Sequence, residues 1–498
     1  MKTLKSVFLP IFGGLIIAQL IGTGFVFFSN LNLYETVLAV EKYGYLALPY
    51  GKASDSLLSY HAAFFGGLFY TLSIGAGLSL VSWAFCHLWY FIFQRNRFFI
   101  AVFFLLWAFL LVAINYNGPT LFPTLFCLLV PLGTLITFYK FRKQQDDFDR
   151  RLLIIPVTTM SFLIVFCVVQ FDRKIIIKIR DHLLFTNPVG QAASDFYYRY
   201  TLHAAQAFIS FDQKTLRTYH LHSNLDGNKV RSIKKSLLRL DLLLVPELSQ
   251  PDLSIIVTNS NIVLHGKHND RVSGELTDFI KNPTELLKSY SKESDRFESL
   301  RLLIFFSFLF GFPSLFFLTI YGLLHIVVDL FVAPRFHGRR GIREITIAFL
   351  FLCITIGLYY PLRVSDLVSI SDEKIGSALE SNDWVKRLAA LQIIEHQRLE
   401  LADYPHYRKI MPNASLVERF WLARALAASK SPQTYLDLLS MIDDIHPNVR
   451  CQVFYALGRR GDKKAIEIIK EQIMASDHWY TQWYGYLSLK RLGWHQGQ

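Results

Sequence analysis

The stretch Ile445 to Ile466 reads IHPNVRCQVFYALGRRGDKKAI, and its apolar residues follow the period of an α-helix. Four of them stand at positions i, i+4, i+7 and i+8 and so share one helix face: Val449, Val453, Ala456 and Leu457. Gly461 and Asp462 come next and are typical of a turn. The stretch therefore predicts a helix that buries one face and a turn into another helix.

The same pattern recurs before and after this stretch. A forward shift of about 32 residues brings Gly461 onto Gly493 and leaves a degenerate copy of the helix, as expected for a cap. Backward shifts of about 31 and about 64 residues begin further copies near Glu418 and Val385. Four units then fill residues 371–498. A period of this length predicts a solenoid, in which each helix pair buries its apolar face against a neighbour.

The motif of these units resembles a HEAT repeat of the bacterial kind. Val449-Arg450 opens the helix, Ala456-Leu457-Gly458 closes it, and Gly461-Asp462 turns into the next. The resemblance covers only residues 371–498 and implies an α-solenoid that binds other proteins. An ordinary helical bundle is the alternative, and it has the same fold class. The remainder of the chain is assigned to no characterised family.

The rest of the chain is unusually apolar. Hydrophobic residues make up 52% of the sequence, and the mean hydropathy is +0.30. A bilayer crossing needs roughly 20 apolar residues, and seven runs are long enough: 7–29, 63–93, 98–115, 120–139, 152–171, 302–330 and 344–362. Small residues at every fourth position, such as Gly14 and Ala18, predict close helix packing. We expect a multi-pass membrane protein.

The net charge of +13 follows the membrane topology. Residues 172–300 hold 18 Lys and Arg against 15 Asp and Glu, and residues 365–498 hold 17 against 16. Next to the spans, thirteen basic residues lie on one side and four on the other. This bias predicts a cytoplasmic N-terminus and, after seven crossings, an extracytoplasmic C-terminus. It argues against a nucleic-acid partner.

The predicted location is the inner (cytoplasmic) membrane, with the soluble parts in the periplasm if the cell is Gram-negative. One alternative stays open. The run 302–333 is longer than one crossing needs and contains Pro313. If this run crossed twice, the array would face the cytoplasm.

The expected architecture has four parts. Residues 1–171 form a membrane domain with five transmembrane helices, and residues 301–364 add two more. Residues 172–300 form an extracytoplasmic α+β domain, with helices expected over 186–208 and 228–240 and near 283–300. Short strands are expected at 242–245, 254–257 and 262–264, the last two as a hairpin. Residues 365–498 form the C-terminal α-solenoid.

Two polar groups in this frame are candidate sites. Asp195, Arg199 and His203 stand at i, i+4 and i+8 and line one helix face, either as a recognition stripe or as an intrahelical charge ladder. His325 and Asp329 stand one turn apart near the end of a predicted span. They either lie at the membrane interface or form an intramembrane polar pair, which is a functional candidate by default.

Motifs for chemistry are missing from the sequence. No G-x-S-x-G, H-E-x-x-H, Walker loop or G-x-G-x-x-G occurs, and the five cysteines form no C-x-x-C. We therefore expect no catalytic residues, no cofactor and no metal site.

The array offers a candidate partner-binding surface. Cys451, Phe454 and Tyr455 are expected to point away from the helix face that the apolar residues bury. Aromatic residues recur at equivalent positions of other units, and such residues dominate interface hot spots. The candidates are Phe420, Phe454, Tyr455, Trp483 and Tyr486. The alternative, of equal weight, is that these rings pack against the α+β domain of the same chain.

Two functions fit these expectations. The first is a non-catalytic membrane scaffold or adaptor, embedded in the lipid bilayer, whose array binds a protein partner in the cell envelope. The second is a membrane enzyme or transporter subunit in which the array is regulatory. The step from repeat to role is analogy.

Overall fold

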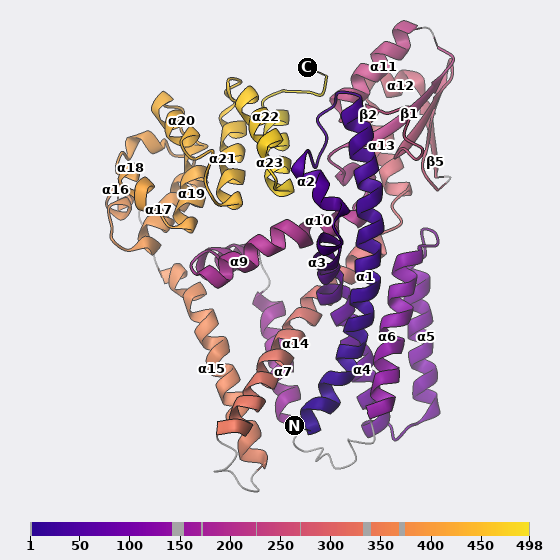
Figure 1. Ribbon diagram of the computed structural model, residues 1–498, viewed down its shortest axis with the longest axis vertical. Coiled ribbons are helices and arrows are strands. Elements are labelled where there is room, and N and C mark those ends of the chain that lie inside the picture. The colour runs from indigo at the N-terminus through magenta and orange to yellow at the C-terminus, as the bar shows by residue number, and fades with distance from the viewer. Residues whose placement is uncertain are drawn as a thin grey trace.

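The computed structural model describes residues 2–141, 154–170, 173–225, 227–268, 270–331, 340–367 and 374–497. Long helices form a bundle, and a five-stranded sheet and a helical array both stand at one end of it (Figure 1). The N-terminus lies at the opposite end of the bundle, and the chain ends between the array and the sheet (Figure 1). Parts that are far apart in the sequence therefore meet above the bundle.

Within the described residues, six helical stretches are long and apolar enough to cross a membrane. They are Phe8–Lys42, Tyr60–Tyr90, Arg97–Ile114, Leu121–Phe141, Glu298–Phe331 and Gly341–Arg363. The elements that build them are α1 (Lys2–Lys42), α3 (Tyr60–Tyr70) with α4 (Ala76–His87), α5 (Arg97–Ile114), α6 (Leu121–Phe141), α14 (Glu298–Phe331) and α15 (Arg340–Leu367). Each corresponds to one predicted span.

The remaining predicted span, 152–171, contains α7 (Ile154–Gln170). Its 17 residues rise about 26 Å, slightly less than a bilayer core of about 30 Å. Ile155–Gln170 is long and apolar enough for a crossing only when it is counted together with Lys174–Leu184. The two helices are bent by 107° relative to each other. The apolar segment is thus present as a helix, but it is shorter than the other candidates.

Pro313 does not interrupt α14. The helix is continuous over the 34 residues Glu298–Phe331, a rise of about 51 Å. The break at Gly311-Phe312-Pro313 that a second crossing would need is therefore not present, and residues 302–331 belong to one helix.

Close approach of small residues holds the bundle together. A Cβ atom at Gly14 would lie 2.3 Å from the hydroxyl oxygens of Ser79 on α4 and Thr134 on α6. One turn further along α1, a Cβ atom built at Gly75 would lie 2.7 Å from the Cβ atom of Ala18. Helices in lipid associate through such contacts, so the predicted role of the small-residue spacing is confirmed as packing.

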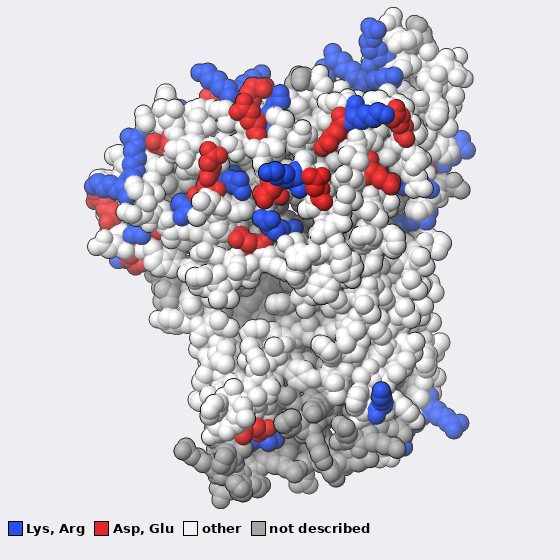
Figure 2. All heavy atoms as spheres, in the orientation of Figure 1, with Lys and Arg blue, Asp and Glu red and all other residues white. Residues whose placement is uncertain are grey.

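Charged side chains avoid the middle of the molecule on the face shown in Figure 2. Lysine, arginine, aspartate and glutamate gather over the array and the sheet, and again at the far end of the bundle (Figure 2). The belt between them shows few charges (Figure 2), and the long helices expose large apolar residues, among them Phe104, Phe109, Leu121, Leu330 and Ile356. A large apolar surface of this kind is unfavourable in contact with water.

The sheet has the order β2-β1-β3-β4-β5. Its strands are β1 (Arg217–Ser223), β2 (Leu242–Leu244), β3 (Leu253–Val257), β4 (Asn261–His265) and β5 (Arg271–Glu275). β1 is parallel to β2 and β3, and α11 (Gly227–Arg239) makes the crossover from β1 to β2. The predicted hairpin is confirmed, with Val257 opposite Ile262. β1 and β5 were not predicted, because their alternating polar residues, as in RTYHLHS and RVSGE, carry little apolar signal.

The packed core of this domain is smaller than the predicted range of 172–300. It extends from Phe211 to Tyr290 and includes α12 (Leu276–Lys281) and α13 (Pro283–Glu293). Residues 173–208 are helical except for 185–187, as predicted for most of them, but α10 (Leu202–Ala205) packs on α3. This segment thus joins the bundle to the array and is not part of the sheet domain.

The array consists of four helix pairs. The first helices are α16 (Ile375–Leu379), α18 (Tyr407–Ile410), α20 (Pro432–Leu439) and α22 (Ala465–Ala475). The second helices are α17 (Trp384–Gln397), α19 (Leu416–Leu426), α21 (Pro447–Arg460) and α23 (Trp479–Arg491), and they begin 31 or 32 residues apart. The four predicted core residues of α21 are all fully buried. Gly461 and Gly493, which the repeat superposes, have φ angles of 79° and 85°, so both occupy the left-handed region.

A candidate docking site on the repeat array

A segment next to the bundle lies across the N-terminal ends of all four second helices. It consists of the helical turn Arg180–Leu184, α9 (Pro188–Phe196) and the turn Tyr197–Thr201. Figure 1 shows α9 crossing between the array and the bundle. We call residues 180–200 the docking segment. The array thus contacts a helical segment of its own chain, in the way that solenoids bind partners.

The Asp181 carboxylate anchors the docking segment. Its side chain is only 1% exposed. One carboxylate oxygen accepts a hydrogen bond from the Trp421 indole N–H at 2.8 Å and from the Gln392 amide at 3.3 Å. The other accepts from the Arg180 guanidinium at 2.7 Å. A buried carboxylate is tolerated only with such partners, so Asp181 ties the segment to both α17 and α19.

Aromatic rings surround this ion pair. The Arg180 guanidinium lies 4.0 Å from the centroid of the Phe420 ring, within the range of a cation–π contact. Phe185 fills the space between Phe420 and His446, at centroid distances of 5.6 and 5.9 Å. His446 is the N-cap residue of α21, so this cluster extends the dock to the third unit.

The polar stripe predicted on α9 and beyond contributes to the same dock. Asp195 Oδ1 lies 3.4 Å from His446 Nε2, and Arg199 lies 4.0 Å from Asp477. Between them, Tyr198 stacks on Tyr480 at a centroid distance of 4.5 Å. Asp195 and Arg199 thus face the array and not each other. The side chain of His203 lies outside the described residues.

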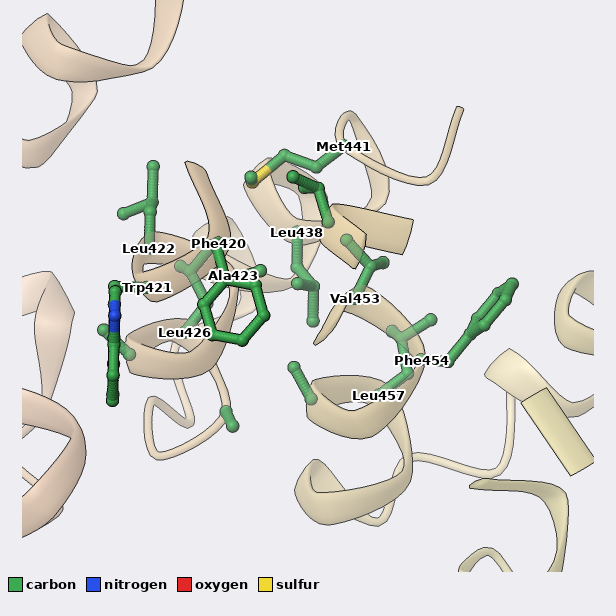
Figure 3. Packing of buried hydrophobic residues seen from close by; sticks show 14 of the residues in the cluster. Phe420, Trp421, Leu422, Ala423, Leu426, Leu438, Met441, Val453, Phe454 and Leu457 are labelled. Atoms are coloured by element: carbon green, nitrogen blue, oxygen red, sulfur yellow. The ribbon is translucent and has the colours of Figure 1, made fainter. Parts of the chain in front are cut away.

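The predicted partner-binding aromatics are mostly used within the chain. Phe420, Phe454 and Tyr486 are at most 3% exposed, and Figure 3 shows Phe420 and Phe454 among the packed apolar residues of the array. The expectation that Cys451 and Phe454 point away from the core is wrong. A stacked second helix has a neighbour on each side, so residues off its inner face are buried as well.

The fourth unit is covered by the sheet domain. Trp483 donates its indole N–H to Thr215 Oγ1 at 3.0 Å, and the Tyr486 hydroxyl donates to Asp241 at 2.7 Å. Lys490 also binds Asp241, at 3.0 Å. For Trp483 and Tyr486 the alternative expectation, packing against the α+β domain, is therefore the one that the structure supports.

Tyr455 is different, because it is half-buried on the open side of the second helices. Three guanidinium groups surround its ring, at 4.9, 5.9 and 5.0 Å from the centroid: Arg424, Arg459 and Arg491. Arg459 also donates to the Tyr455 hydroxyl at 3.0 Å. We call these residues, with Glu395, the Tyr455 patch.

The Tyr455 patch carries an excess of positive charge. Glu395 accepts hydrogen bonds from Arg424 at 2.8 Å and from Arg459 at 3.3 Å. Arg491 is exposed. Three cations and one anion leave two positive charges over an aromatic ring, on a surface that four consecutive units build. Such a surface is suited to an acidic, partly aromatic ligand.

The predicted pair His325 and Asp329 belongs to a larger cluster between α14 and α15. Glu344, which is 6% exposed, accepts hydrogen bonds from the Tyr321 hydroxyl at 3.0 Å and, as the contact distance of 3.1 Å indicates, from His325 Nε2. Arg343 contacts Asp329 at 3.1 Å and Glu344 at 3.3 Å. His325 and Asp329 are thus linked through Glu344 and Arg343.

Sequence reasoning missed many contributors to these sites, among them Arg180, Asp181 and Glu344. Asp181 and Arg180 follow an apolar stretch and resemble ordinary charges at a membrane surface. Glu344 stands at the first position of a predicted span, where a charge is unremarkable. Its burial depends on Tyr321 and His325 in another helix. Among the described residues, no three His, Cys, Asp or Glu side chains gather to hold a metal ion.

Comparison with protein families identifies residues 407–489 as HEAT repeats. The match covers the second, third and fourth units of the array and bears out the resemblance drawn from the sequence. HEAT repeats in general mediate protein–protein interaction. Searches of curated proteins and of solved structures find no match.

Replacing Asp181 by alanine is expected to loosen the dock. The Arg180 guanidinium and the Trp421 indole would lose their acceptor, at a cost of about 3 kcal/mol for a broken buried pair. Hydrogen–deuterium exchange of residues 180–200 in the full chain should then become on the order of 100-fold faster. Glu471→Ala, an exposed acid on α22, is the control and should change nothing. Unchanged protection in Asp181→Ala would contradict the role of this carboxylate.

The folded chain is also expected to lose stability in acid because of His478, the N-cap residue of α23. The pKa of this imidazole is lowered to about 4. Burial is the largest cause, and the positive charges of Arg199 and Arg450 add to it. In the unfolded chain the pKa is about 6.5. Between these values only the unfolded chain binds the proton, so the stability that His478 contributes is complete above pH 6.5 and is lost towards pH 4.

Denaturation curves of wild type and His478→Gln at pH 7 and pH 4.5 measure this effect. The stability of wild type relative to the variant should fall by about 2 to 3 kcal/mol between the two pH values. A difference that is independent of pH would show that His478 titrates normally.

Proposed function

We propose that the chain is a multi-pass protein of the inner (cytoplasmic) membrane, with the array and the sheet domain on the extracytoplasmic side. In a Gram-negative cell that side is the periplasm. The uncharged belt in Figure 2 and the six long apolar helices support the insertion. The bias of basic residues supports the orientation, since the N-terminus and the array lie at opposite ends of the bundle.

In this setting the protein acts as a non-catalytic scaffold that holds a partner protein through its repeat array. The Tyr455 patch carries the proposal, because three arginines from three second helices converge there on one half-buried aromatic ring. Arginine and tyrosine are the residues most enriched in interface hot spots.

The partner that fits the patch is a protein segment with acidic side chains. Guanidinium groups bind carboxylates through paired hydrogen bonds, and the excess of two positive charges speeds association with an anionic surface. The arginines also stand in the last turns of their helices, where they offset the helix dipole. That structural role does not require three of them to converge on one tyrosine.

A second function, a membrane enzyme or transporter subunit regulated by the array, rests on the cluster around Glu344. Acidic residues buried between membrane helices commonly belong to ion or proton pathways. The cluster ranks second because its five side chains bind one another and so resemble a clamp between α14 and α15.

Topology reporters test the compartment. Fusions at Gln498 and after Arg343 should report opposite sides of the membrane, extracytoplasmic for Gln498 and cytoplasmic for Arg343. The reason is that α15 crosses once between them. A cytoplasmic signal at Gln498 would move the array, and the search for its partner, into the cytosol.

Photo-crosslinking from the Tyr455 patch tests the role. A photoreactive amino acid at Tyr455 in intact membranes should crosslink a protein through a segment rich in Asp and Glu. The double variant Arg459→Glu with Arg491→Glu should reduce the yield about tenfold or more, because like charges would then meet across the interface. Arg459→Lys with Arg491→Lys should keep most of the yield.

Two controls make the result specific. The photoreactive residue at Leu436, which is 56% exposed on the first helix α20, samples the array outside the patch. Lys463→Glu with Lys464→Glu changes the charge by the same amount outside the patch. Equal crosslinking from positions 455 and 436, or equal losses in both double variants, would rule out the patch as the binding surface.

A further inference from the structure

A cavity of about 240 Å³ lies where α1, the sheet domain and the array meet. One face of α1 forms its longest wall, at the helical spacing of Val26, Asn30, Leu33, Val37 and Val40. These positions span 14 residues, or about 21 Å along the helix axis. The cavity is therefore long and narrow.

The other two walls come from the soluble parts. Trp479 and Trp483 of α23 form the array side of the cavity. Lys214, Asp252 and Lys267 form the side of the sheet domain. Because Trp483 donates a hydrogen bond to Thr215, the array and the sheet domain hold this wall in one position.

The charged wall is electropositive. Asp252 accepts from Lys214 Nζ at 2.7 Å and from the Thr218 backbone N–H at 3.0 Å, and Lys267 Nζ lies 3.7 Å away. Burial alone would raise the pKa of Asp252, but the two ammonium groups and these hydrogen bonds outweigh it and lower the pKa. The carboxylate is thus ionised. Two cations share one anion, and one positive charge is left facing the cavity.

The position of the cavity along α1 coincides with the edge of the apolar belt. Between the cavity and the N-terminus, α1 exposes Phe12 and Leu20, which are 58% and 67% accessible. From the level of the cavity upward, Asn32 and Glu35 are exposed. In the proposed membrane orientation, the phosphate groups of the outer leaflet lie at this height, and tryptophan is the residue typical of this level.

We infer that this cavity binds a glycerol-linked phosphate monoanion, the chemistry of an anionic phospholipid headgroup. Lysine ammonium groups are common phosphate ligands, and Ser29, Thr36 and Gln206 offer polar groups for glycerol hydroxyls. The volume is below that of a site for a drug-sized molecule, so the headgroup enters and the acyl chains stay in the membrane. A choline headgroup would place a cation beside two lysines and is excluded.

The site depends on the proposed membrane orientation but not on the proposed scaffold role. A headgroup bound there contacts α1, the sheet domain and the array at once. The lipid is then part of the junction that holds the array on the bundle.

Lipid titration of the purified full chain tests the site. Native mass spectrometry measures the affinity for phosphatidylglycerol and for phosphatidylcholine, and sn-glycerol 3-phosphate serves as the free-phosphate probe. Lys267→Gln removes one ammonium and leaves the bond between Lys214 and Asp252 intact. It should weaken phosphatidylglycerol binding about tenfold, the loss expected for one charge-assisted hydrogen bond.

Lys267→Arg should retain binding and so guards against a folding defect. Lys229→Gln, an exposed lysine on α11, should behave as wild type. Binding of the lipid alone assigns the ligand to the membrane, and binding of glycerol phosphate as well shows that the headgroup suffices. Equal affinity of wild type and Lys267→Gln for phosphatidylglycerol would overturn the inference. So would equal affinity for phosphatidylcholine, or binding of neither phosphate probe.

Discussion

The buried carboxylate of Asp181 is the constraint around which the molecule is arranged. It lies between the Arg180 guanidinium and the Trp421 indole, away from water. A buried charge without these partners is costly, so the docking segment and the array can separate only by exposing both the ion pair and the rings that cover it. The array is consequently fixed on the helical bundle and is not a module on a flexible tether.

This fixation divides the surface of the array. The N-terminal ends of the second helices bind the docking segment, and the fourth unit binds the sheet domain through Trp483 and Tyr486. The side near Tyr455 is left to face outward, with arginines from three helices. The binding capacity of a HEAT array is thus used twice: once for its own chain, and once for the partner that we propose. The phosphate cavity lies at the junction that the first use creates.

Much of the fold is predictable because its signals are local. A helix with the pattern of Val449 and Leu457 buries the same face in any solenoid, and long apolar runs become long helices. The sheet was predicted only in part, because β1 and β5 alternate polar residues and depend on their neighbours for pairing. The site was predicted least well. Asp195, Arg199 and His325 were found as candidates, but their partners His446, Asp477 and Glu344 belong to other elements or connections of the fold.

The amino-acid sequence by itself determined the number and period of the repeats, the turn that follows Gly461, and the apolar helices of the bundle, since each is visible in the local spacing of apolar and glycine residues. Only the tertiary structure decided which aromatic residues are buried and which face outward. Phe454 and Tyr455 are adjacent and chemically similar, yet Phe454 is enclosed by the next unit, whereas Tyr455 lies among arginines. Their difference arises from the stacking of separate helices, which no local pattern encodes.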